Sequence, residues 1–359
     1  MPPLQWAPSH HLPRKGDGTM STLRPPDKLI DDLRSAVAAE LTTLPAYLYA
    51  YWTIKPAQLG GSVAAEKART TIMSVILEEM LHMAQASNIL NALGGTPDFT
   101  SAPYLPVYPC RLLRSPHPQP KLPPPHDNPG GWGVEVFLRR LSIGKDGSIT
   151  NFMAIELPKW FDPKAVTLGE FYDGIIVPEL PKDPSRWTRE RQFPSWNNPG
   201  AGRLLAVSSY EDAMRGVTTI VDQGEGTKMG DHDDGDHELA HFWKFKAVHD
   251  LIASGQLNLA QDVYPVVDSP SSYVASYTAA QQQANRAFNS TYSQLLDAIT
   301  QALQTGAPDV FPKSAGLMEM LGQQAAVLRQ QGNVPGTQQL AGPTFEYVSA
   351  PQRIGAKGA

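Results

Sequence analysis

The chain has 359 residues, of which 41% are hydrophobic, and a formal net charge of −5. This composition can bury a sizeable core and offers no broad basic face, so a wholly disordered chain is excluded and no nucleic-acid partner is expected. The single cysteine, Cys110, excludes a disulfide framework and a metal cage built of cysteines. No apolar run reaches the roughly 18 residues of a membrane span, and the N-terminus lacks the pattern of a signal peptide. We therefore expect a cytoplasmic protein without a membrane partner.

The first third of the chain predicts an extended arm followed by two long helices. Residues 1–27 are rich in proline and show no regular spacing of apolar residues. From Asp27 onward, apolar residues recur at three- and four-residue steps, which predicts a helix that ends near Pro56. A second apolar stripe predicts a helix over 62–93, ended by a pair of glycines. Because only a short Gly-rich link joins them, the two helices should pack antiparallel.

The middle of the chain has a different composition. Eleven prolines fall within 97–129, which predicts a loop because proline fixes φ and removes a backbone donor. The stretch 133–157 carries β-branched and apolar residues on both sides of a Lys-Asp-Gly turn, which predicts a β-hairpin. The capping box Thr167-x-x-Glu170 predicts a short helix over 167–176. Residues 180–203 are again expected to form a loop.

Helical patterns return in the last part of the chain. Two precede Pro265 and two follow it, and the tail beyond Asn333 is expected to be irregular. The four predicted helices cover 210–223, 236–254, 271–304 and 314–331.

Several acidic and histidine residues fall on the apolar stripes of these helices. Glu40 lies on the stripe of the first helix, and Glu79 and His82 lie three residues apart on the second. Glu238 and His241 repeat that spacing near the start of the helix predicted over 236–254, so each pair should face the same way. Carboxylates buried together are very costly, because each raises the pKa of the other. Divalent cations among them would neutralise the charge.

Two Glu-x-x-His pairs with further single glutamates are the ligand pattern of a ferritin-like four-helix bundle. Carboxylates and imidazoles with open positions suit iron or manganese better than structural zinc. We expect iron, most simply as a pair of ions, with manganese or a single metal ion as alternatives. An alternative stays open for each of these residues taken alone. It could lie at the edge of its stripe and reach solvent or cap a helix instead of binding a metal.

The fourth carboxylate is open between three residues. Glu238 lies at the start of its helix, so an antiparallel partner helix should donate a ligand from its own last turn. This favours Glu225, with Asp222 and Glu170 as alternatives. The run of acidic residues and histidines over 231–237 is compatible with a second cation site, although a solvated loop at a helix N-terminus is the simpler interpretation. Aromatic residues of the middle segment, among them Tyr172, are candidates for the wall of a substrate pocket.

The sequence also resembles a known family at these residues. The blocks EEMLH (78–82), GEFYDGI (169–175), QGEG (223–226) with ELAH (238–241), and GPTFEYV (342–348) are similar to the ferritin-like family typified by the violacein-pathway protein VioB, often labelled iminophenylpyruvate dimer synthase. The similarity runs from about residue 28 to residue 350. It implies a helical bundle with a β-containing insert and a setting in specialised metabolism, where amino-acid-derived imines are oxidatively coupled. The metal ligands that it implies are Glu40, Glu79, His82, Glu225, Glu238 and His241.

We therefore expect a mainly α protein built on a ferritin-like four-helix bundle. The bundle should occupy 28–255, interrupted by a Pro-rich, β-hairpin-containing insert over 97–205. An extended arm over 1–27 should precede it, and 256–359 should supply C-terminal helices and a tail that pack on the bundle.

The expected function is that of a non-haem oxidase or oxygenase that uses O2 on a small aromatic or amino-acid-derived substrate. A metal-binding protein that oxidises iron or removes peroxide without an organic substrate is the alternative. A purely structural scaffold is disfavoured, because the stripes hold no Lys or Arg at a depth that would pair with the inward acids. A homo-oligomer, or association with another enzyme of the same pathway, is compatible with the sequence.

Overall fold

The computed structural model describes residues 27–101, 104–113, 132–158, 167–193, 196–198, 201–226, 239–306 and 310–355. The predicted arm therefore lies outside the described residues except for its last position. Glu238 and the acidic run over 231–237 lie outside them as well. The division of the chain into arm, bundle and C-terminal helices stays a prediction.

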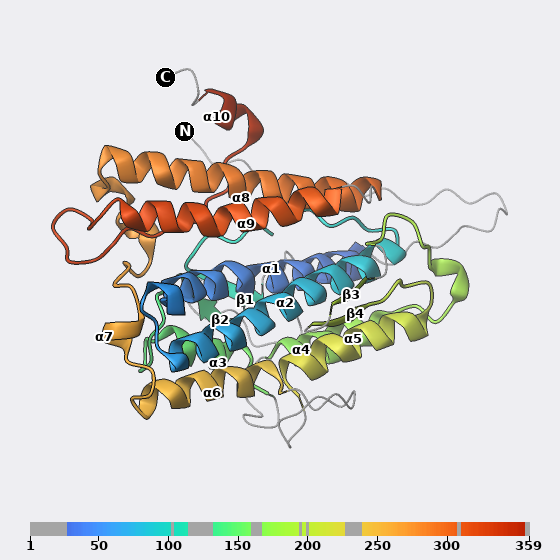
Figure 1. Ribbon diagram of the computed structural model, residues 1–359. Coiled ribbons are helices and arrows are strands. Elements are labelled where there is room, and N and C mark those ends of the chain that lie inside the picture. The colour runs from blue at the N-terminus through green and yellow to red at the C-terminus, as the bar shows by residue number, and fades with distance from the viewer. Residues whose placement is uncertain are drawn as a thin grey trace, which may run out of the picture.

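The described chain is mainly helical, as predicted, and its small sheets are antiparallel pairs of strands. Figure 1 shows the α8–α9 hairpin along one side of the α1–α2 hairpin, and α3, α5 and α6 along the other. The helices are α1 (Asp27–Thr53), α2 (Val63–Ala92), α3 (Ser148–Ile155), α4 (Leu168–Phe171), α5 (Tyr210–Gly224), α6 (His241–Ala253), α7 (Leu259–Asp262), α8 (Ala279–Thr305), α9 (Val310–Gln330) and α10 (Ala350–Gly355), and the strands are β1 (Cys110–Leu113), β2 (Trp132–Val136), β3 (Trp196–Asn198) and β4 (Gly202–Leu204).

Helices α1 and α2 form the antiparallel hairpin that the sequence predicts. The hydroxyl of Ser62 accepts a hydrogen bond from the amide of Ala65 and so caps the start of α2, and the chain leaves α2 through Gly94 at φ +81°. Helix α1 is surrounded by α2, by α9, by the β1–β2 sheet and by the turn that follows α4. Its residues are accordingly buried on nearly every face from Leu33 to Tyr47. A polar side chain on these faces must find its partners inside the protein.

The β-hairpin predicted over 133–157 is wrong in its second half. The segment after the Lys-Asp-Gly turn forms α3, because Ile149, Phe152 and Ile155 recur at the helical period and all three are buried. The strand β2 pairs instead with β1, which lies in the proline-rich stretch predicted to be a loop. Strand β1 is possible within this stretch because none of its four residues is a proline.

The rest of the insert agrees in part with the sequence. The hydroxyl of Thr167 accepts a hydrogen bond from the amide of Glu170 and starts α4, as the capping signal predicts. A π-helical turn, Tyr172–Ile176, continues this helix. The loop predicted over 180–203 contains the short β3–β4 hairpin, which the sequence did not reveal.

Helix α5 agrees with its predicted range, but α6 begins later than expected. Its N-cap is Ala240, in an extended conformation, and its first residue is His241. The expectation that Glu238 and His241 face the same way assumed one continuous helix, so it no longer applies. Helices α5 and α6 both pack against α2, and they meet where α5 ends and α6 begins rather than lying side by side (Figure 1). The antiparallel pairing expected for the helix of Glu238 is therefore wrong.

The C-terminal helices begin and end at different residues than predicted. Helix α8 begins only at Ala279, because Thr278 and Gln281 form a complete capping box, and 3-10 turns precede it. The tail after α9 is irregular as expected, except for the short helix α10. Within this tail Phe345 is buried and its ring stacks on that of Trp52 at 5.8 Å, which ties the α8–α9 hairpin to α1.

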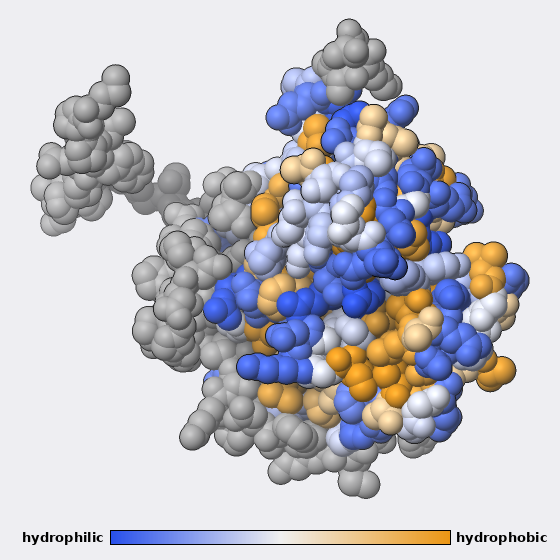
Figure 2. Space-filling view, turned by 90° about the vertical axis from the view of Figure 1, so that its left-hand side faces the viewer, coloured by the Kyte–Doolittle hydropathy of each residue, from blue (hydrophilic) through white to orange (hydrophobic). Residues whose placement is uncertain are grey.

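Exposed apolar side chains gather on the end of the molecule where the α1–α2 connection lies. Figure 2 shows an apolar patch on this end, at the lower right of the view. Leu59 and Val63, on the two sides of the connection, are 61% and 90% exposed. Among the described helices, none combines the length and the apolar character needed to cross a bilayer.

Candidate metal centre

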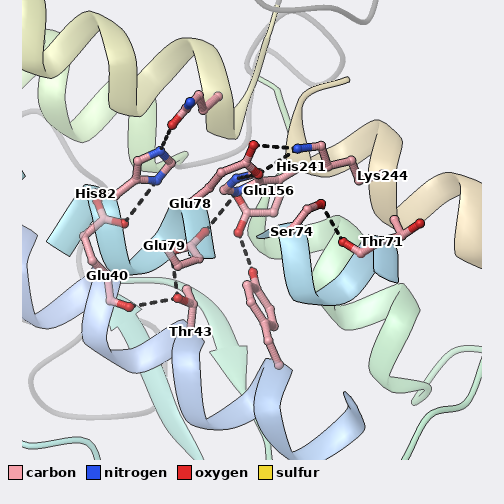
Figure 3. A network of polar contacts seen from close by, with 12 residues as sticks. Glu40, Thr43, Thr71, Ser74, Glu78, Glu79, His82, Glu156, His241 and Lys244 are labelled. Carbon is pink, nitrogen blue, oxygen red and sulfur yellow. Dashed lines mark hydrogen bonds and ion pairs between the residues drawn. The ribbon is translucent and has the colours of Figure 1, made fainter. Parts of the chain in front are cut away.

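Glu40, Glu79 and His82 face one another in the interior between α1 and α2 (Figure 3). Their side chains are at most 2% exposed, so the stripe positions predicted from the sequence are buried. Nδ1 of His82 lies 3.9 Å from Oε2 of Glu40. The antiparallel pairing of the two helices brings these residues to the same depth.

His241, the first residue of α6, completes the cluster from the opposite side. Its Nδ1 lies 2.9 Å from Oε1 of Glu79 and 3.5 Å from Oε2 of Glu156. Its ring lies nearly parallel to that of His82, with the centroids 5.3 Å apart. Ligand atoms of Glu79, His82 and His241 all lie within 4.8 Å of one another, a spacing that can hold a metal ion. Four of the six residues proposed from the sequence are thus brought together.

The outer nitrogen of each histidine is held by a second residue. Nε2 of His82 lies 2.7 Å from Oε1 of Gln223, in the last turn of α5. Nε2 of His241 lies 3.0 Å from Oε2 of Glu78. With the outer nitrogens engaged in this way, both rings present Nδ1 to the space between the carboxylates. Such outer partners fix the orientation of a metal-binding imidazole.

Lys244 corrects the expectation that no basic residue lies at this depth. Its Nζ donates to both carboxylate oxygens of Glu78, at 2.6 and 2.7 Å, and the residue is buried. Lys244 thus accounts for the charge of one acid, Glu78. Among the described residues, the ion pairs of Glu40, Glu79 and Glu156 are with histidines and not with lysine or arginine.

Hydroxyl groups hold one oxygen of each remaining carboxylate. Tyr172 donates to Oε1 of Glu40 at 2.8 Å, and Thr43 donates to Oε2 of Glu79 at 2.8 Å. Tyr47 donates to Oε1 of Glu156. Burial and the neighbouring glutamates raise the pKa of Tyr47 and Tyr172 well above the usual value for tyrosine, so both stay protonated donors. Tyr172, expected to wall a pocket, instead contacts a candidate ligand.

The electrostatics of the cluster show an excess of buried negative charge. Burial and the charge of Glu79 raise the pKa of Glu40 well above its usual range. Burial and the charge of Glu156 raise the pKa of Glu79 to about 7. Burial would lower the pKa of His241, but the surrounding glutamates raise it well above the usual value. Burial also opposes the charge of Glu78, yet His241 and Lys244 bring the pKa of this carboxyl down to about 2.

Two further observations indicate that the carboxylates and imidazoles of the cluster suit a divalent cation. Oε2 of Glu40 and Nδ1 of His241 are buried without a well-aligned hydrogen bond to any described residue. Two ligand atoms bound at right angles, each about 2.1 Å from one ion, are about 3.0 Å apart. The 2.9 Å between His241 and Glu79 matches this spacing. A cation would therefore use atoms that otherwise stay unsatisfied.

Glu225 lines the same pocket as three residues of the cluster. Its Oε1 accepts a hydrogen bond of 2.8 Å from the amide of Gly169, and a Cβ at Gly169 would come within 2.6 Å of that oxygen. A pocket joins Glu225 to Glu79, His82 and Glu156. Its remaining wall is formed by Ile155, Leu168, Gly169, Ile220, Val221 and Gly224. Glu225 as a ligand therefore stays a prediction.

The other described candidates for the fourth carboxylate do not line this pocket. Glu170 and Asp222 are not among the residues that line this pocket. Glu238 falls outside the described residues, so its assignment also stays a prediction.

Glu156 is the functional candidate that the sequence analysis missed. It is the C-cap of α3 and is 5% exposed. The signal that identified Glu40 was present here too, because Glu156 follows Phe152 by four residues and Ile149 by seven on one helical face. The interpretation of this stretch as a strand hid that spacing. Gln223 and Glu78 carry no comparable local signal, since their roles depend on partners distant in sequence.

These pKa shifts predict that the metal-free protein loses stability as the pH rises. Between about pH 4.5 and 7 the folded state holds a proton on Glu79 that the unfolded chain has released, so the free energy of unfolding falls with increasing pH. The raised pKa of His241 acts in the same direction above pH 6.5. We expect a decline on the order of 1 kcal/mol per pH unit in urea unfolding of chelator-treated protein between pH 5 and 8. Glu79→Gln should flatten this decline, and a constant or rising free energy would contradict the prediction.

Comparison with known proteins identifies the family and the fold. The family model described as ferritin-like matches residues 33–250. Dichlorochromopyrrolate synthase of Lentzea aerocolonigenes is 24% identical over 396 aligned positions, which cover 91% of this chain but 36% of that enzyme. The crystal structure of a ferritin-like protein from Caulobacter vibrioides has a TM-score of 0.58 at 19% identity, covering 90% of this chain and 98% of the other. The chain thus spans about a third of the curated relative, and the solved structure bears on the fold alone.

Proposed function

The chain belongs to the ferritin-like family, and from this premise we propose that it is a non-haem, metal-dependent oxidase or oxygenase. Its substrate would be a small aromatic or amino-acid-derived molecule of specialised metabolism, as in the oxidative coupling of imines, with O2 as the oxidant. The similarity to a biosynthetic synthase supports a small organic substrate. Because the chain corresponds to only part of that relative, the substrate is chosen by chemical class rather than by the name of the relative.

One observation supports this proposal most directly. Glu40, Glu79, His82, Glu156 and His241 each have an atom directed into one shared, buried space. Carboxylate oxygens and imidazole nitrogens are ligands that suit iron and manganese. We propose a pair of iron ions here, with Glu225 and Glu238 as further ligands, and with manganese or a single ion as alternatives. Bound iron would supply the electron transfer and the affinity for O2 that these side chains lack.

The chain's own residues would perform the remaining tasks. The carboxylates of Glu40, Glu79 and Glu156 would balance the charge of the bound metal. The two histidines would hold it through Nδ1. The pocket beside the cluster has the apolar side chains of Ile155, Leu168, Ile220 and Val221 in its wall. Apolar groups there would exclude water and contact an aromatic or aliphatic part of the substrate. Glu225, at the same pocket, offers a carboxylate to a donor group of the substrate.

The pocket beside the cluster holds little free space, which favours a second candidate function. A ferritin-like protein that oxidises iron or removes peroxide needs a path for ions and no organic substrate. The same cluster of Glu79, His82 and His241 would serve it. The two functions differ in whether an organic molecule accelerates the use of O2.

Anaerobic titration with Fe(II), followed by admission of O2, tests the proposal. We expect saturable binding of Fe(II) and consumption of O2 that becomes faster with aromatic 2-oxo acids plus ammonium, which equilibrate with imines. Mass analysis of the products should show oxidised or coupled substrate. Consumption of O2 or peroxide that is indifferent to every organic addition would establish the second candidate instead. A protein that binds no Fe(II), Mn(II) or Co(II) would overturn both.

A further inference from the structure

The three carboxylates nearest the histidines share one arrangement. Each accepts a hydroxyl hydrogen on one oxygen and directs its other oxygen toward an Nδ1 atom. For Glu40, Oε1 accepts from Tyr172, while Oε2 lies 3.9 Å from His82. For Glu79, Oε2 lies 2.8 Å from the Thr43 hydroxyl, whose hydrogen is shared with the backbone oxygen of Glu40, also at 2.8 Å. Its Oε1 lies 2.9 Å from Nδ1 of His241.

Glu156 repeats this division of its two oxygens. Its Oε1 accepts from Tyr47, and its Oε2 lies 3.5 Å from Nδ1 of His241. In each case the hydroxyl donates to the outer oxygen, which is the carboxylate oxygen farther from Nδ1. The three donors come from separate positions in the chain. We call Thr43, Tyr47 and Tyr172 the hydroxyl trio.

We propose that the hydroxyl trio restricts Glu40, Glu79 and Glu156 to binding a metal ion through one oxygen each, and so keeps coordination positions open for O2 or substrate. This inference rests on the metal centre of the proposed function and makes the trio a set of positioning residues. A carboxylate can bind a cation through one oxygen or through both. A hydrogen bond to the outer oxygen occupies one of its lone pairs and orients the carboxylate, which disfavours binding through both oxygens. A catalytic metal site needs an open position.

The local structure explains how the trio reaches its targets. Glu40, Thr43 and Tyr47 lie three and four residues apart on α1, so one face of this helix supplies a candidate ligand and the supports of two others. Tyr172 is the first residue of the π-helical turn after α4. This turn packs against α1 and places the phenol beside Glu40.

All three donors are in the protein interior, where a hydrogen bond is costly to lose. Thr43, Tyr47 and Tyr172 are each fully buried. Removing one hydroxyl leaves the outer oxygen of its carboxylate without that donor, and binding a cation through both oxygens becomes the way to satisfy it.

Binding of Co(II) tests the inference, because its visible absorption reports the number and type of its ligands. The variants are Tyr172→Phe, Tyr47→Phe and Thr43→Val, which remove one hydroxyl each and keep every proposed ligand. We expect each variant to bind Co(II) about 10–100-fold more weakly, as is typical for loss of an outer hydrogen-bond partner. The absorption bands of bound Co(II) should change with the added carboxylate oxygen.

Tyr49→Phe is the matched control. Tyr49 is a buried tyrosine of the same helix, and its hydroxyl donates to the backbone oxygen of Val267 at 2.6 Å, away from the cluster. We expect this variant to lose thermal stability but to keep the wild-type spectrum and affinity. A merely structural role for the trio would make all four variants behave in this way.

The outcomes separate this inference from the proposed function. Wild-type spectra and affinities in the three variants would overturn the inference and leave the metal centre in place. The variants could change the Co(II) spectrum while the iron-loaded wild-type protein consumes no O2. That result would support the inference and overturn the proposed activity. A wild-type protein that binds no Co(II) would overturn the metal centre and the inference together.

Discussion

Replacing Glu79 with glutamine is expected to weaken Fe(II) binding by more than about 100-fold, because loss of a direct ligand should exceed the 10–100-fold effect of losing an outer partner. The same change should make the metal-free protein at least as stable as the wild type. At pH 7 the buried Glu79 is only partly ionised, because burial and Glu156 raise its pKa to about 7 and so oppose its charge. The neutral amide retains the volume and can still accept the hydrogen bond from Thr43. Metal analysis after reconstitution and urea unfolding of the chelator-treated protein measure the two effects.

The opposite signs of these effects distinguish a ligand from a structural residue. Glu66→Gln is the control, because Glu66 lies in the first turn of the same helix and its side chain is 52% exposed. It should change neither metal content nor stability. If Glu79→Gln lowered stability and retained full metal content, Glu79 would be a structural residue and the proposed centre would lose its central ligand.

Replacing Lys244 with methionine is expected to lower the free energy of unfolding at pH 7 by at most about 3–5 kcal/mol, the usual cost of breaking a buried ion pair, because His241 still faces Glu78. Lys244 donates to both oxygens of Glu78, and both residues are buried. The effect should depend on pH in a defined direction. The pKa of Glu78 is lowered to about 2, so its stabilising contribution is present above about pH 4.5 and is lost as the pH falls from there toward 2. Urea unfolding at pH 7 and at about pH 3, inside the range where the contribution is lost, measures both predictions.

Two further variants make this test specific. Glu78→Gln in the Lys244→Met background should recover much of the lost stability, because no buried charge is then left unpaired. Lys246→Met is the matched control, since Lys246 pairs with Asp250 on the exposed side of the same helix. That exposed pair should contribute less than about 1 kcal/mol. Equal losses from the two lysine variants would show that charge on α6, rather than the buried pair, determines the stability.

The residues that the sequence could locate are those whose role follows from local spacing. Glu40, Glu79 and His82 lie on stripes that continue for many turns, and a long periodic stripe determines both the helix and the direction of its side chains. The α1–α2 pairing followed from the short link between the helices. Burial of these residues was therefore predictable before any tertiary contact was known.

The remaining partners depend on contacts that no local pattern records. Lys244 and Glu78 are 166 residues apart, and neither position differs locally from that of an exposed helical residue. Glu156 was hidden because α3 is only eight residues long, a length at which strand and helix patterns overlap. The start of α6 was placed too early, because acidic residues before His241 also fit the first turn of a helix.

The distances in sequence between the parts of the centre have a consequence for how the protein acquires its ion. Glu78 and Lys244 are 166 residues apart, and His82 and Gln223 are 141 residues apart, so both loops must close before the cavity exists. Closing long loops is slow, and their entropy is lost before the contacts repay it. We therefore expect a cation to enter a bundle whose topology is already complete rather than to template its fold. Once bound, it should slow the reopening of that bundle.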